Sequence, residues 1–266
     1  MVAVKRAYVD TSIGQIHYRH AGEGGVLLLL HHTASSSHFF EPLMRACASS
    51  LSVFAVDTPG FGLSDHPPHP YTIADYARSI AEFLHVLNIP TANILGHHTG
   101  ASIACELAAS VPETVNKLIL SGPACFDVEQ RKQWLGKVRA LDLKEDGSHL
   151  QPLWGYMTGL SPEGRDLELE EKHEEYVWRL KAGPRSIDAY RAVFSYDMAS
   201  RLPLIQSPTL VISGEHDTLI DAVEPSAHLL KRVQVRIVPD ASVFLAVQDP
   251  EGMARIILDF IAKPGI

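Results

Sequence analysis

Short apolar runs rich in β-branched residues alternate along most of the chain with segments whose apolar residues recur at helical spacing. This alternation is typical of a largely parallel sheet whose strands are joined by crossover helices. The pattern therefore predicts an α/β fold. The runs that we interpret as strands are Gln15–Tyr18, Val26–Leu30, Val53–Val56, Asn93–Leu95, Leu118–Leu120, Leu210–Ile212 and Val233–Val238.

Two helices are marked clearly by the same pattern. The first follows Thr72, a suitable N-cap, with Asp75 three residues later, and Asn88 and Pro90 are expected to end it. Its apolar stripe consists of Ile73, Tyr76, Ala77, Ile80, Leu84 and Leu87. The second, Met253–Ile261, carries an apolar face that we expect to pack on the sheet.

The alternation breaks between about residues 126 and 200. This stretch is helical in pattern, has glycine and proline breaks, and contains no convincing strand. We therefore predict a core domain of residues 1–125 and 201–266, with residues 126–200 inserted as a helical cap after the sixth strand. The cap is expected over the sheet edge where open α/β sheets bind ligands. We interpret its charged run, Glu168 to Arg179, as a solvated helix face.

Charge and cysteine content narrow the class of protein. The 266-residue chain has a formal net charge of −8, which argues against nucleic acid or an anionic membrane as a partner. Cys47, Cys105 and Cys125 are odd in number and widely spaced, which favours reduced thiols. The first residues lack a secretory apolar stretch, and no apolar run approaches the ~20 residues that span a bilayer. We expect a cytoplasmic protein with a small-molecule substrate. The sequence does not decide whether the protein forms a homodimer.

A pentapeptide with chemical meaning lies between an apolar run and a helical segment rich in small residues. Gly96–Gly100 reads G-H-H-T-G, which has the form of the G-x-S-x-G nucleophile elbow with His98 in the place of serine. The strand–turn–helix context is the one that the motif requires. Upstream, the predicted strand ending at Leu30 is followed by His31-His32-Thr33, a loop in which His32 occupies the place of a glycine.

These motifs resemble the α/β-hydrolase fold along nearly the whole chain. The residues that carry the resemblance are His31–Thr33, Asp57–Asp65, Gly96–Gly100, Gly214–Asp217 and Phe244–Leu245 before Asp249–Glu251. The Asp57–Asp65 run is particularly similar to the meta-cleavage-product hydrolases, which cleave carbon–carbon bonds. The resemblance implies a mostly parallel eight-stranded sheet flanked by helices, with an inserted helical cap.

The resemblance also implies where a catalytic triad would stand, in the order nucleophile, acid, base. In this sequence the nucleophile position holds His98, the acid position holds Asp217 and the base position holds Val243. Two of the three members are replaced, so a serine acyl-enzyme at these positions is excluded. An imidazole at residue 98 is longer than a serine, and the loss of one at residue 243 leaves space beside Asp217. We therefore predict a rebuilt His98–Asp217 pair; a decayed, non-catalytic site is the alternative.

His32 is expected beside His98 at the floor of the pocket, because the two loops are neighbours in the resembled fold. The set His32, His98 and Asp217 has the composition of a 2-His-1-carboxylate site for Zn²⁺, Fe²⁺ or Mn²⁺. A metal-free pair is the alternative. His31 and His97 are interpreted as residues that brace the loops.

The expected function is cleavage of a C–C, C–carboxyl or ester bond of a small organic acid, with an aromatic-derived acid favoured by the resemblance. His98 and Asp217 would act as an acid–base pair or activate a metal-bound water, and His32 would assist. Backbone N–H groups near Thr33 and Thr99 are candidates for an oxyanion hole. Val243 and, from the cap, Trp154 are candidates for substrate contact. Two alternatives remain: a hydrolase in which His98 is the nucleophile, and a non-catalytic ligand-binding protein on the same scaffold.

Overall fold

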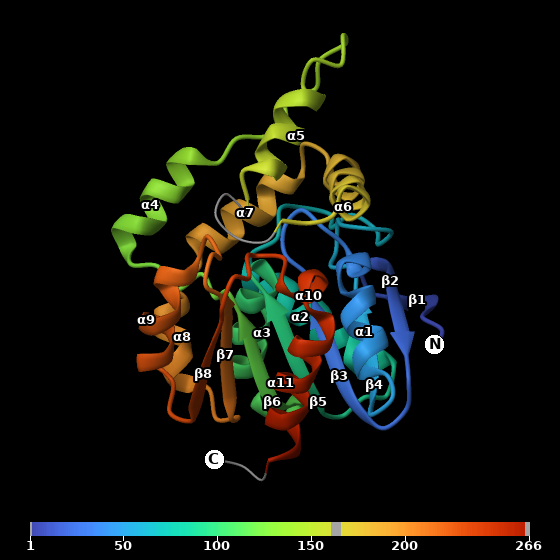
Figure 1. Ribbon diagram of the computed structural model, residues 1–266, viewed down its shortest axis with the longest axis vertical. Helices are drawn as coiled ribbons and strands as arrows, with labels where there is room; N and C mark the ends of the chain where they lie inside the picture. Colours follow the sequence, from blue (N-terminus) through green and yellow to red (C-terminus); the bar gives the residue numbers. More distant parts are fainter. Residues whose placement is uncertain (1, 161–165, 264–266) are drawn as a thin grey trace.

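Eight strands form one sheet in the computed structural model, which describes residues 2–160 and 166–263 (Figure 1). Their order across the sheet is β1-β2-β4-β3-β5-β6-β7-β8. The strands are β1 (Lys5–Thr11), β2 (Gly14–Ala21), β3 (Gly25–Leu30), β4 (Leu51–Val56), β5 (Ala92–His97), β6 (Val115–Ser121), β7 (Thr209–Gly214) and β8 (Val233–Val238). The predicted eight-stranded, mostly parallel sheet is confirmed.

Only β2 runs against its neighbours: it pairs antiparallel with β1 and β4, whereas β3 to β8 pair in parallel. The sequence pattern did not identify β1 as a strand. This strand lies at the edge of the sheet, and Tyr8 in its middle is 51% exposed. An edge strand of this kind has no continuous apolar run to mark it.

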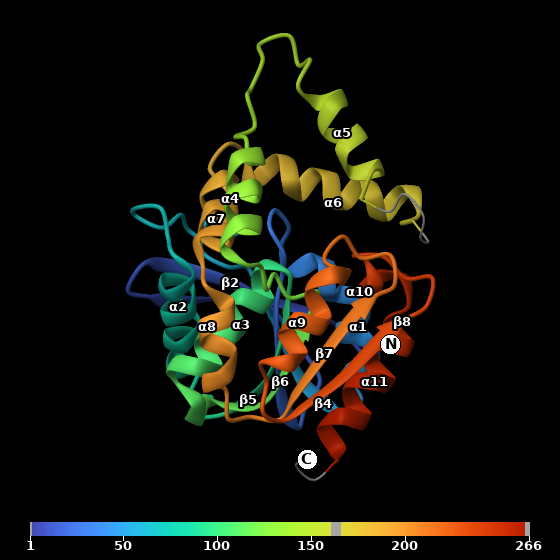
Figure 2. The ribbon, with the colours of Figure 1, turned by 90° about the vertical axis from the view of Figure 1, so that its left-hand side faces the viewer.

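Helices cover both faces of the sheet (Figure 2). One face carries α2 (Ile73–Val86), α3 (Thr99–Ser110) and α9 (Val223–His228), and the other carries α1 (Glu41–Cys47), α10 (Leu245–Gln248) and α11 (Pro250–Ala262). Successive strand residues serve opposite faces, as the pleat requires: Leu28 and Leu30 pack towards α2 and α3, whereas Leu27 and Leu29 pack towards α1 and α11. The sheet is therefore buried on both sides.

The helix predicted after Thr72 is α2. The Thr72 hydroxyl accepts from the Asp75 N–H, and the Asp75 carboxylate accepts from the Thr72 N–H, which is a capping box. The helix ends at Val86, and Asn88 beyond it has a φ of 55° in the left-handed region. The last helix begins at Pro250, earlier than predicted, because Asp249 accepts from the Gly252 N–H and caps it.

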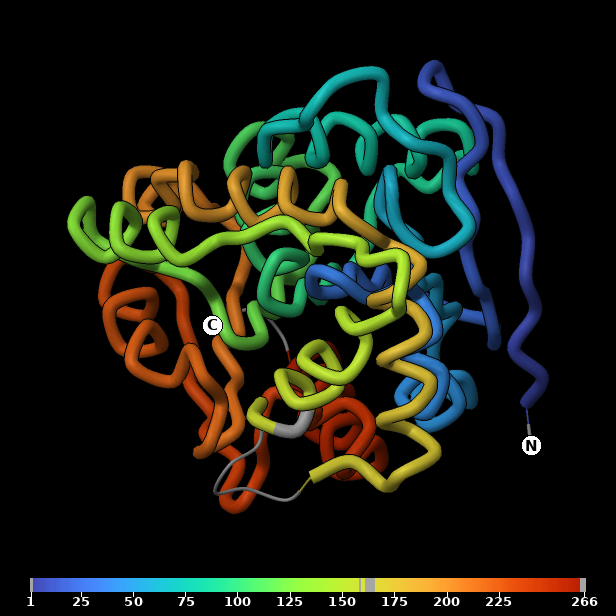
Figure 3. The backbone as a smooth tube through the Cα atoms, turned by 90° about the horizontal axis from the view of Figure 1, so that it is seen from above, coloured from blue at the N-terminus to red at the C-terminus, as the bar shows by residue number. Residues whose placement is uncertain are grey.

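The segment between β6 and β7 is helical. It contains α4 (Val128–Lys137), α5 (Leu150–Thr158), α6 (Leu169–Ala182), α7 (Ser186–Ser195) and α8 (Met198–Arg201). We call α4 to α7 the cap, because they lie over the ends of the strands while α8 packs beside α3 (Figures 1 and 3). In the described part of residues 126–200, no strand joins the sheet.

Four short 3-10 turns complete the described secondary structure: Ser37–Phe40, Pro112–Thr114, Leu202–Leu204 and Ile220–Ala222. None of the helices in the part of the chain that the structure describes has the length and apolar character needed to cross a membrane.

The strand order reverses at β3. The chain moves from β3 to β4 on one side, and then returns to β5 on the other side of β3. The loops that leave β3 and β5 therefore diverge at the carboxyl edge of the sheet, which is where open α/β sheets form a ligand crevice. The loop after β3 carries His31 and His32, and the loop after β5 carries His98.

Candidate active site

His98 stands alone between β5, which ends at His97, and α3, which begins at Thr99. Its backbone has a φ of 51° and a ψ of −107°, outside the regions that most residues adopt. The flanking Gly96 and Gly100 permit this sharp turn, because a Cβ at either would clash with the backbone of α3 or of β3. The turn aims the His98 side chain away from the sheet edge, as in a nucleophile elbow.

The structure brings His98 and Asp217 together. The His98 Nε2 lies 3.0 Å from both carboxylate oxygens of Asp217, which follows β7. Burial alone would raise the pKa of Asp217, but the adjacent His98 imidazole and the Leu219 N–H outweigh it and lower that pKa to about 2. Asp217 is therefore ionised at neutral pH. Because the carboxylate can only accept, the His98 Nε2 carries the proton of this hydrogen bond, and Nδ1 is the ring nitrogen that can act as a base.

Gly122 is a site residue that the sequence analysis missed. A Cβ at this position would lie 2.6 Å from the His98 Nε2 and 2.8 Å from the Asp217 Oδ2, and the φ of 55° favours glycine. Gly122 directly follows β6, which lies between β5 and β7 in the sheet. The loops after β5 and β7 carry His98 and Asp217, and Gly122 stands at the same place after the strand between them. This position is the signal that could have identified Gly122.

Val243 occupies the core rather than a substrate pocket. Its side chain is 3% exposed and belongs to the apolar cluster under α10 and α11. It offers no group that could accept a proton. Val243 is not among the residues that line the described cavities, so its substrate contact stays a prediction.

Thr33 and Thr99, the candidate oxyanion residues, bind each other. The Thr33 N–H donates to the Thr99 Oγ1 at 3.3 Å, and the Thr99 hydroxyl donates to the Thr33 Oγ1 at 2.8 Å. The cap contributes Tyr190, whose hydroxyl donates to the Thr33 carbonyl at 2.9 Å. The Thr33 N–H can therefore serve a substrate oxygen only if that oxygen replaces the Thr99 hydroxyl.

Three imidazoles pack at the floor of the site. The ring centroid of His32 lies 5.3 Å from that of His97 and 6.4 Å from that of His98. Burial, followed by the proximity of His98, lowers the pKa of His32 and of His97 well below the ordinary histidine value. Both rings are therefore neutral at neutral pH.

His31 and His97, which the sequence analysis interpreted as bracing residues, each contact a neighbouring group. His31 Nδ1 lies 2.8 Å from the carbonyl oxygen of His32, and its Nε2 accepts from the Thr58 N–H at 3.1 Å. His97 Nδ1 lies 3.0 Å from the Ser121 hydroxyl oxygen. Both side chains are buried.

The predicted metal ligands do not converge. In residues 2–160 and 166–263, one group of three side chains has ligand atoms that all lie within 4.8 Å of one another. It consists of Glu215, His216 and Asp240, and it is largely exposed. The His98 Nε2 faces the Asp217 oxygens, whereas the His32 Nε2 faces Glu175 at 3.6 Å. The set His32, His98 and Asp217 is thus not arranged around one centre, and metal binding there stays a prediction.

Two charged residues of α6 face the site, which corrects the interpretation of this helix as a wholly solvated face. Glu175 is 4% exposed and Arg179 is 8% exposed. Arg179 donates to the Tyr190 hydroxyl at 3.1 Å, and its guanidinium lies 5.1 Å from the Tyr156 ring centroid. Among the residues with described placement, Arg179 has no carboxylate within 4.0 Å. The spacing of four residues puts Glu175 and Arg179 on one side of the helix.

A cavity of about 620 Å³ opens within the cap. Its lining is aromatic and basic and includes Trp134, Tyr156, Arg179, Tyr190 and Phe194. The predicted substrate contact Trp154 is not part of this lining. Its ring packs instead against Tyr176, with centroids 5.2 Å apart. Tyr190 links the cavity to the core, because it also contacts Thr33.

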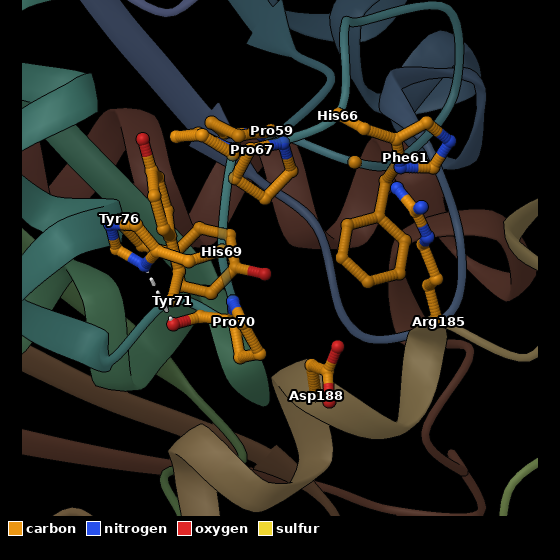
Figure 4. A pocket seen from close by; sticks show the side chains of 12 residues that line it. Pro59, Phe61, His66, Pro67, His69, Pro70, Tyr71, Tyr76, Arg185 and Asp188 are labelled. Atoms are coloured by element: carbon orange, nitrogen blue, oxygen red, sulfur yellow. Dashed lines mark hydrogen bonds between the residues drawn. The ribbon is translucent and has the colours of Figure 1, made fainter.

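A second pocket, of about 240 Å³, lies between the loop after β4 and the start of α7 (Figure 4). Its lining includes Phe61, His69, Tyr76, Arg185 and Asp188. None of the predicted site residues contributes to it. The predicted site residues do not line the cap cavity either, but Tyr190 of that cavity contacts Thr33. We therefore place the candidate site at the His98–Asp217 pair and take the cap cavity as the candidate substrate space.

Comparison with known proteins agrees with this architecture. The α/β hydrolase fold family model matches residues 25–250, and the chain belongs to that family. The chain is 27% identical to the 2-(acetamidomethylene)succinate hydrolase of Mesorhizobium japonicum, over 95% of this chain and 94% of that protein. It is 28% identical to the poly(3-hydroxyalkanoate) depolymerase of Ectopseudomonas oleovorans, over 89% and 84%.

Solved structures show the same fold. The enol-lactonase of Burkholderia xenovorans matches with a TM-score of 0.78 at 20% identity, over 97% of this chain and 100% of that one. The family match and the two sequence relatives place the chain among the hydrolases of the α/β-hydrolase superfamily. Membership of this family implies a small-molecule substrate.

Proposed function

We propose that this chain is an enzyme that cleaves an ester, C–C or C–carboxyl bond of a small organic acid without a serine acyl-enzyme. His98 acts as the general base and Asp217 holds it. The observation that carries the proposal is the contact of the His98 Nε2 with both Asp217 oxygens at 3.0 Å. This contact rebuilds the orienting half of a triad from the elbow position.

In the hydrolytic form of the reaction, the His98 Nδ1 removes a proton from a water molecule that attacks the substrate carbonyl. The ionised Asp217 stabilises the imidazolium that forms. The His98 side chain is 17% exposed, so a water molecule can reach it, whereas Asp217 is 2% exposed and stays shielded. Backbone N–H groups at the start of α3, near Thr99, offer positive electrostatic potential to the developing oxyanion.

Arg179 supports an acidic substrate. A buried guanidinium is stable only with strong acceptors, and a carboxylate is the acceptor that its planar group binds best. Arg179 lines the cap cavity beside the aromatic rings of Tyr156 and Tyr190. The relative that hydrolyses 2-(acetamidomethylene)succinate has a substrate with carboxylate groups, and the resemblance to carbon–carbon hydrolases agrees with an aromatic lining.

The test uses p-nitrophenyl acetate and the mono-p-nitrophenyl ester of succinic acid. We expect the wild type to prefer the succinate ester, and Arg179→Gln to lose this preference through KM. We expect His98→Ala and Asp217→Asn to lower kcat by about 100-fold or more, with an unchanged circular dichroism spectrum. Ligand binding without turnover in the wild type would instead indicate a binding protein.

A nucleophilic His98 is the enzymatic alternative. It predicts an acylimidazole, which rapid quenching and mass spectrometry would detect on the peptide containing His98. General-base catalysis predicts no such adduct.

We also propose that the protein is cytoplasmic. The three cysteines, Cys47, Cys105 and Cys125, are buried and form no disulfide bond, which supports a reducing compartment.

A further inference from the structure

The pocket between the loop after β4 and the start of α7 is not used by the mechanism above. Its walls come from both layers: the core supplies residues of the 59–71 loop and Tyr76 of α2, and the cap supplies Arg185 and Asp188 (Figure 4). Its volume of about 240 Å³ is below the ~300 Å³ at which pockets for drug-sized molecules begin. A ligand here is therefore small and touches the core and the cap together.

Two opposite charges on the cap side of this pocket do not pair with each other. Arg185 is the N-cap residue of α7 and Asp188 lies in the first turn, so both side chains are on one side of the helix. Arg185 extends instead towards the loop that carries Phe61 and His66 (Figure 4), and in the described part of the chain it forms no ion pair with a carboxylate. Asp188 lies 3.6 Å from Arg191, but their side chains are 28% and 61% exposed, and such a pair contributes little to stability. Both charges of the pocket are therefore available to a ligand.

Two tyrosine hydroxyls on the core side have no hydrogen-bond partner. Tyr71 and Tyr76 line the pocket, are 8% and 3% exposed, and meet edge to face with ring centroids 5.3 Å apart. Among the described residues neither hydroxyl forms a hydrogen bond, and neither oxygen is sealed from solvent. Buried hydroxyls are normally hydrogen-bonded, so these two indicate a partner that comes from the pocket. Burial, followed by the nearby Asp188, raises the pKa of Tyr76, so its hydroxyl is protonated and can donate.

We propose that this pocket binds a small zwitterion, namely an α-amino acid with an apolar side chain. The carboxylate of the ligand accepts from the Arg185 guanidinium, and its ammonium group donates to Asp188. The hydroxyls of Tyr71 and Tyr76 complete the hydrogen bonds of these two charged groups. Phe61 and four prolines of the loop supply the apolar wall that the side chain of the ligand contacts. A ligand with only one charge leaves the other charge of the pocket unpaired.

Helix α7 connects this pocket to the candidate site. Tyr190, which follows Asp188 on this helix, donates to the Thr33 carbonyl of the core. A ligand that holds Asp188 and the 59–71 loop together favours the arrangement in which α7 rests on the core. A ligand that binds only the folded protein also stabilises it by mass action, so we expect the amino acid to raise the Tm. Binding does not depend on the reaction proposed above, because no group of that reaction lines the pocket.

The test titrates the protein by calorimetry with L-leucine and with two analogues that each lack one charge. Isocaproate lacks the ammonium group, and isoamylamine lacks the carboxylate. We expect saturable binding of L-leucine at one site per chain, and weaker binding of each analogue by about tenfold or more, because a charged group of the pocket loses its partner. An analogue that binds as tightly as L-leucine, or a protein that does not bind L-leucine, would overturn the proposal.

Two substitutions remove the charges of the pocket. Arg185→Gln and Asp188→Asn should each weaken the binding of L-leucine by about tenfold or more, with an unchanged circular dichroism spectrum. Arg191→Gln is the matched control, because it removes an arginine from the same helix and frees Asp188 from a competing cation. This control should bind L-leucine as tightly as the wild type or more tightly. Full binding in Arg185→Gln or in Asp188→Asn would contradict the site.

The cap cavity is the other place where an acid is expected to bind, so Arg179→Gln separates the two sites. This variant should bind L-leucine as the wild type does, and L-leucine should raise the Tm of the wild type and of His98→Ala equally. Loss of L-leucine binding in Arg179→Gln would place the amino acid in the cap cavity and overturn the proposal. A wild type that hydrolyses no ester would overturn the proposed function and not this site.

Discussion

The His98–Asp217 pair depends on a residue without a side chain. Gly122 lies against both members, at the end of the strand that separates theirs in the sheet. Any Cβ there would occupy the space of the hydrogen bond itself. The pairing therefore depends on the loops after β5, β6 and β7. The loops after β5 and β7 supply the two side chains, and the loop after β6 supplies the space between them.

We expect Gly122→Ala to inactivate the enzyme. The new methyl group would lie 2.6 Å from the His98 Nε2 and 2.8 Å from the Asp217 Oδ2, so the pair must separate. The positive φ adds a destabilisation of about 1 kcal/mol. Steady-state kinetics on the nitrophenyl ester would measure the loss of kcat. Gly136→Ala is the control, because a Cβ at that position meets nothing within 4 Å; equal activity of the two variants would contradict the prediction.

Asp217 should also make stability depend on pH in acid. Its pKa is about 2 in the folded protein against an ordinary value of 3.8, so it stabilises the fold fully above about pH 4 and loses this contribution as pH falls towards 2. The lost contribution is about 2 kcal/mol. Urea unfolding at pH 6 and pH 3 should show the gap between the wild type and Asp217→Asn narrowing at the lower pH. A constant gap would mean that the carboxylate is not stabilised in its ionised form.

At the scale of elements, strands β2 to β8 and helices α2 and α11 followed from apolar periodicity, because they are buried on faces that the sequence encodes locally. The short helices α1, α9 and α10 were not predicted. β1 was missed because an edge strand with exposed residues lacks that pattern. The His98–Asp217 pair could be predicted because a motif fixes the positions of both residues. Glu175 could not, because its contact with Ser35 joins residues 140 positions apart and depends on how the cap docks. Charge alone does not tell which side of α6 is covered.

The capping box of α2 provides a test of local encoding. Thr72→Ala removes the hydroxyl that accepts from the Asp75 N–H, and we expect it to lower the free energy of unfolding by about 1 kcal/mol. Thr72→Ser keeps the acceptor and should retain most of that stability. Thermal unfolding followed by circular dichroism measures both. A serine variant as unstable as the alanine variant would show that the methyl group, not the cap, matters.

At the scale of the whole molecule, the site is divided between two layers. The core supplies His32, His98 and Asp217, and the cap supplies Glu175 and Arg179. Along the loop after β3, the hydrogen bonds between the described residues of the two layers include one from Ser35 to Glu175 and one from Tyr190 to Thr33.

Metal dependence is a property of the whole protein that a single measurement decides. The orientation of the His98 Nε2 towards Asp217 supports a metal-free pair. We expect full activity after exhaustive chelation, and no stoichiometric Zn²⁺, Fe²⁺ or Mn²⁺ in elemental analysis of protein purified without added metal. Metal that is present at one equivalent and lost in both His32→Ala and His98→Ala would restore the metal interpretation.

The hydrogen bond from Tyr190 to the Thr33 carbonyl means that the cap rests on the same short segment that would receive the oxygen of the substrate. A molecule that holds Tyr190 away from the Thr33 carbonyl also disturbs the place where the substrate oxygen would bind. Such a molecule would occupy the enzyme without being consumed. We therefore expect bulky acids to be competitive inhibitors rather than slow substrates. The size of an acid should then change its kcat more than its affinity for the enzyme.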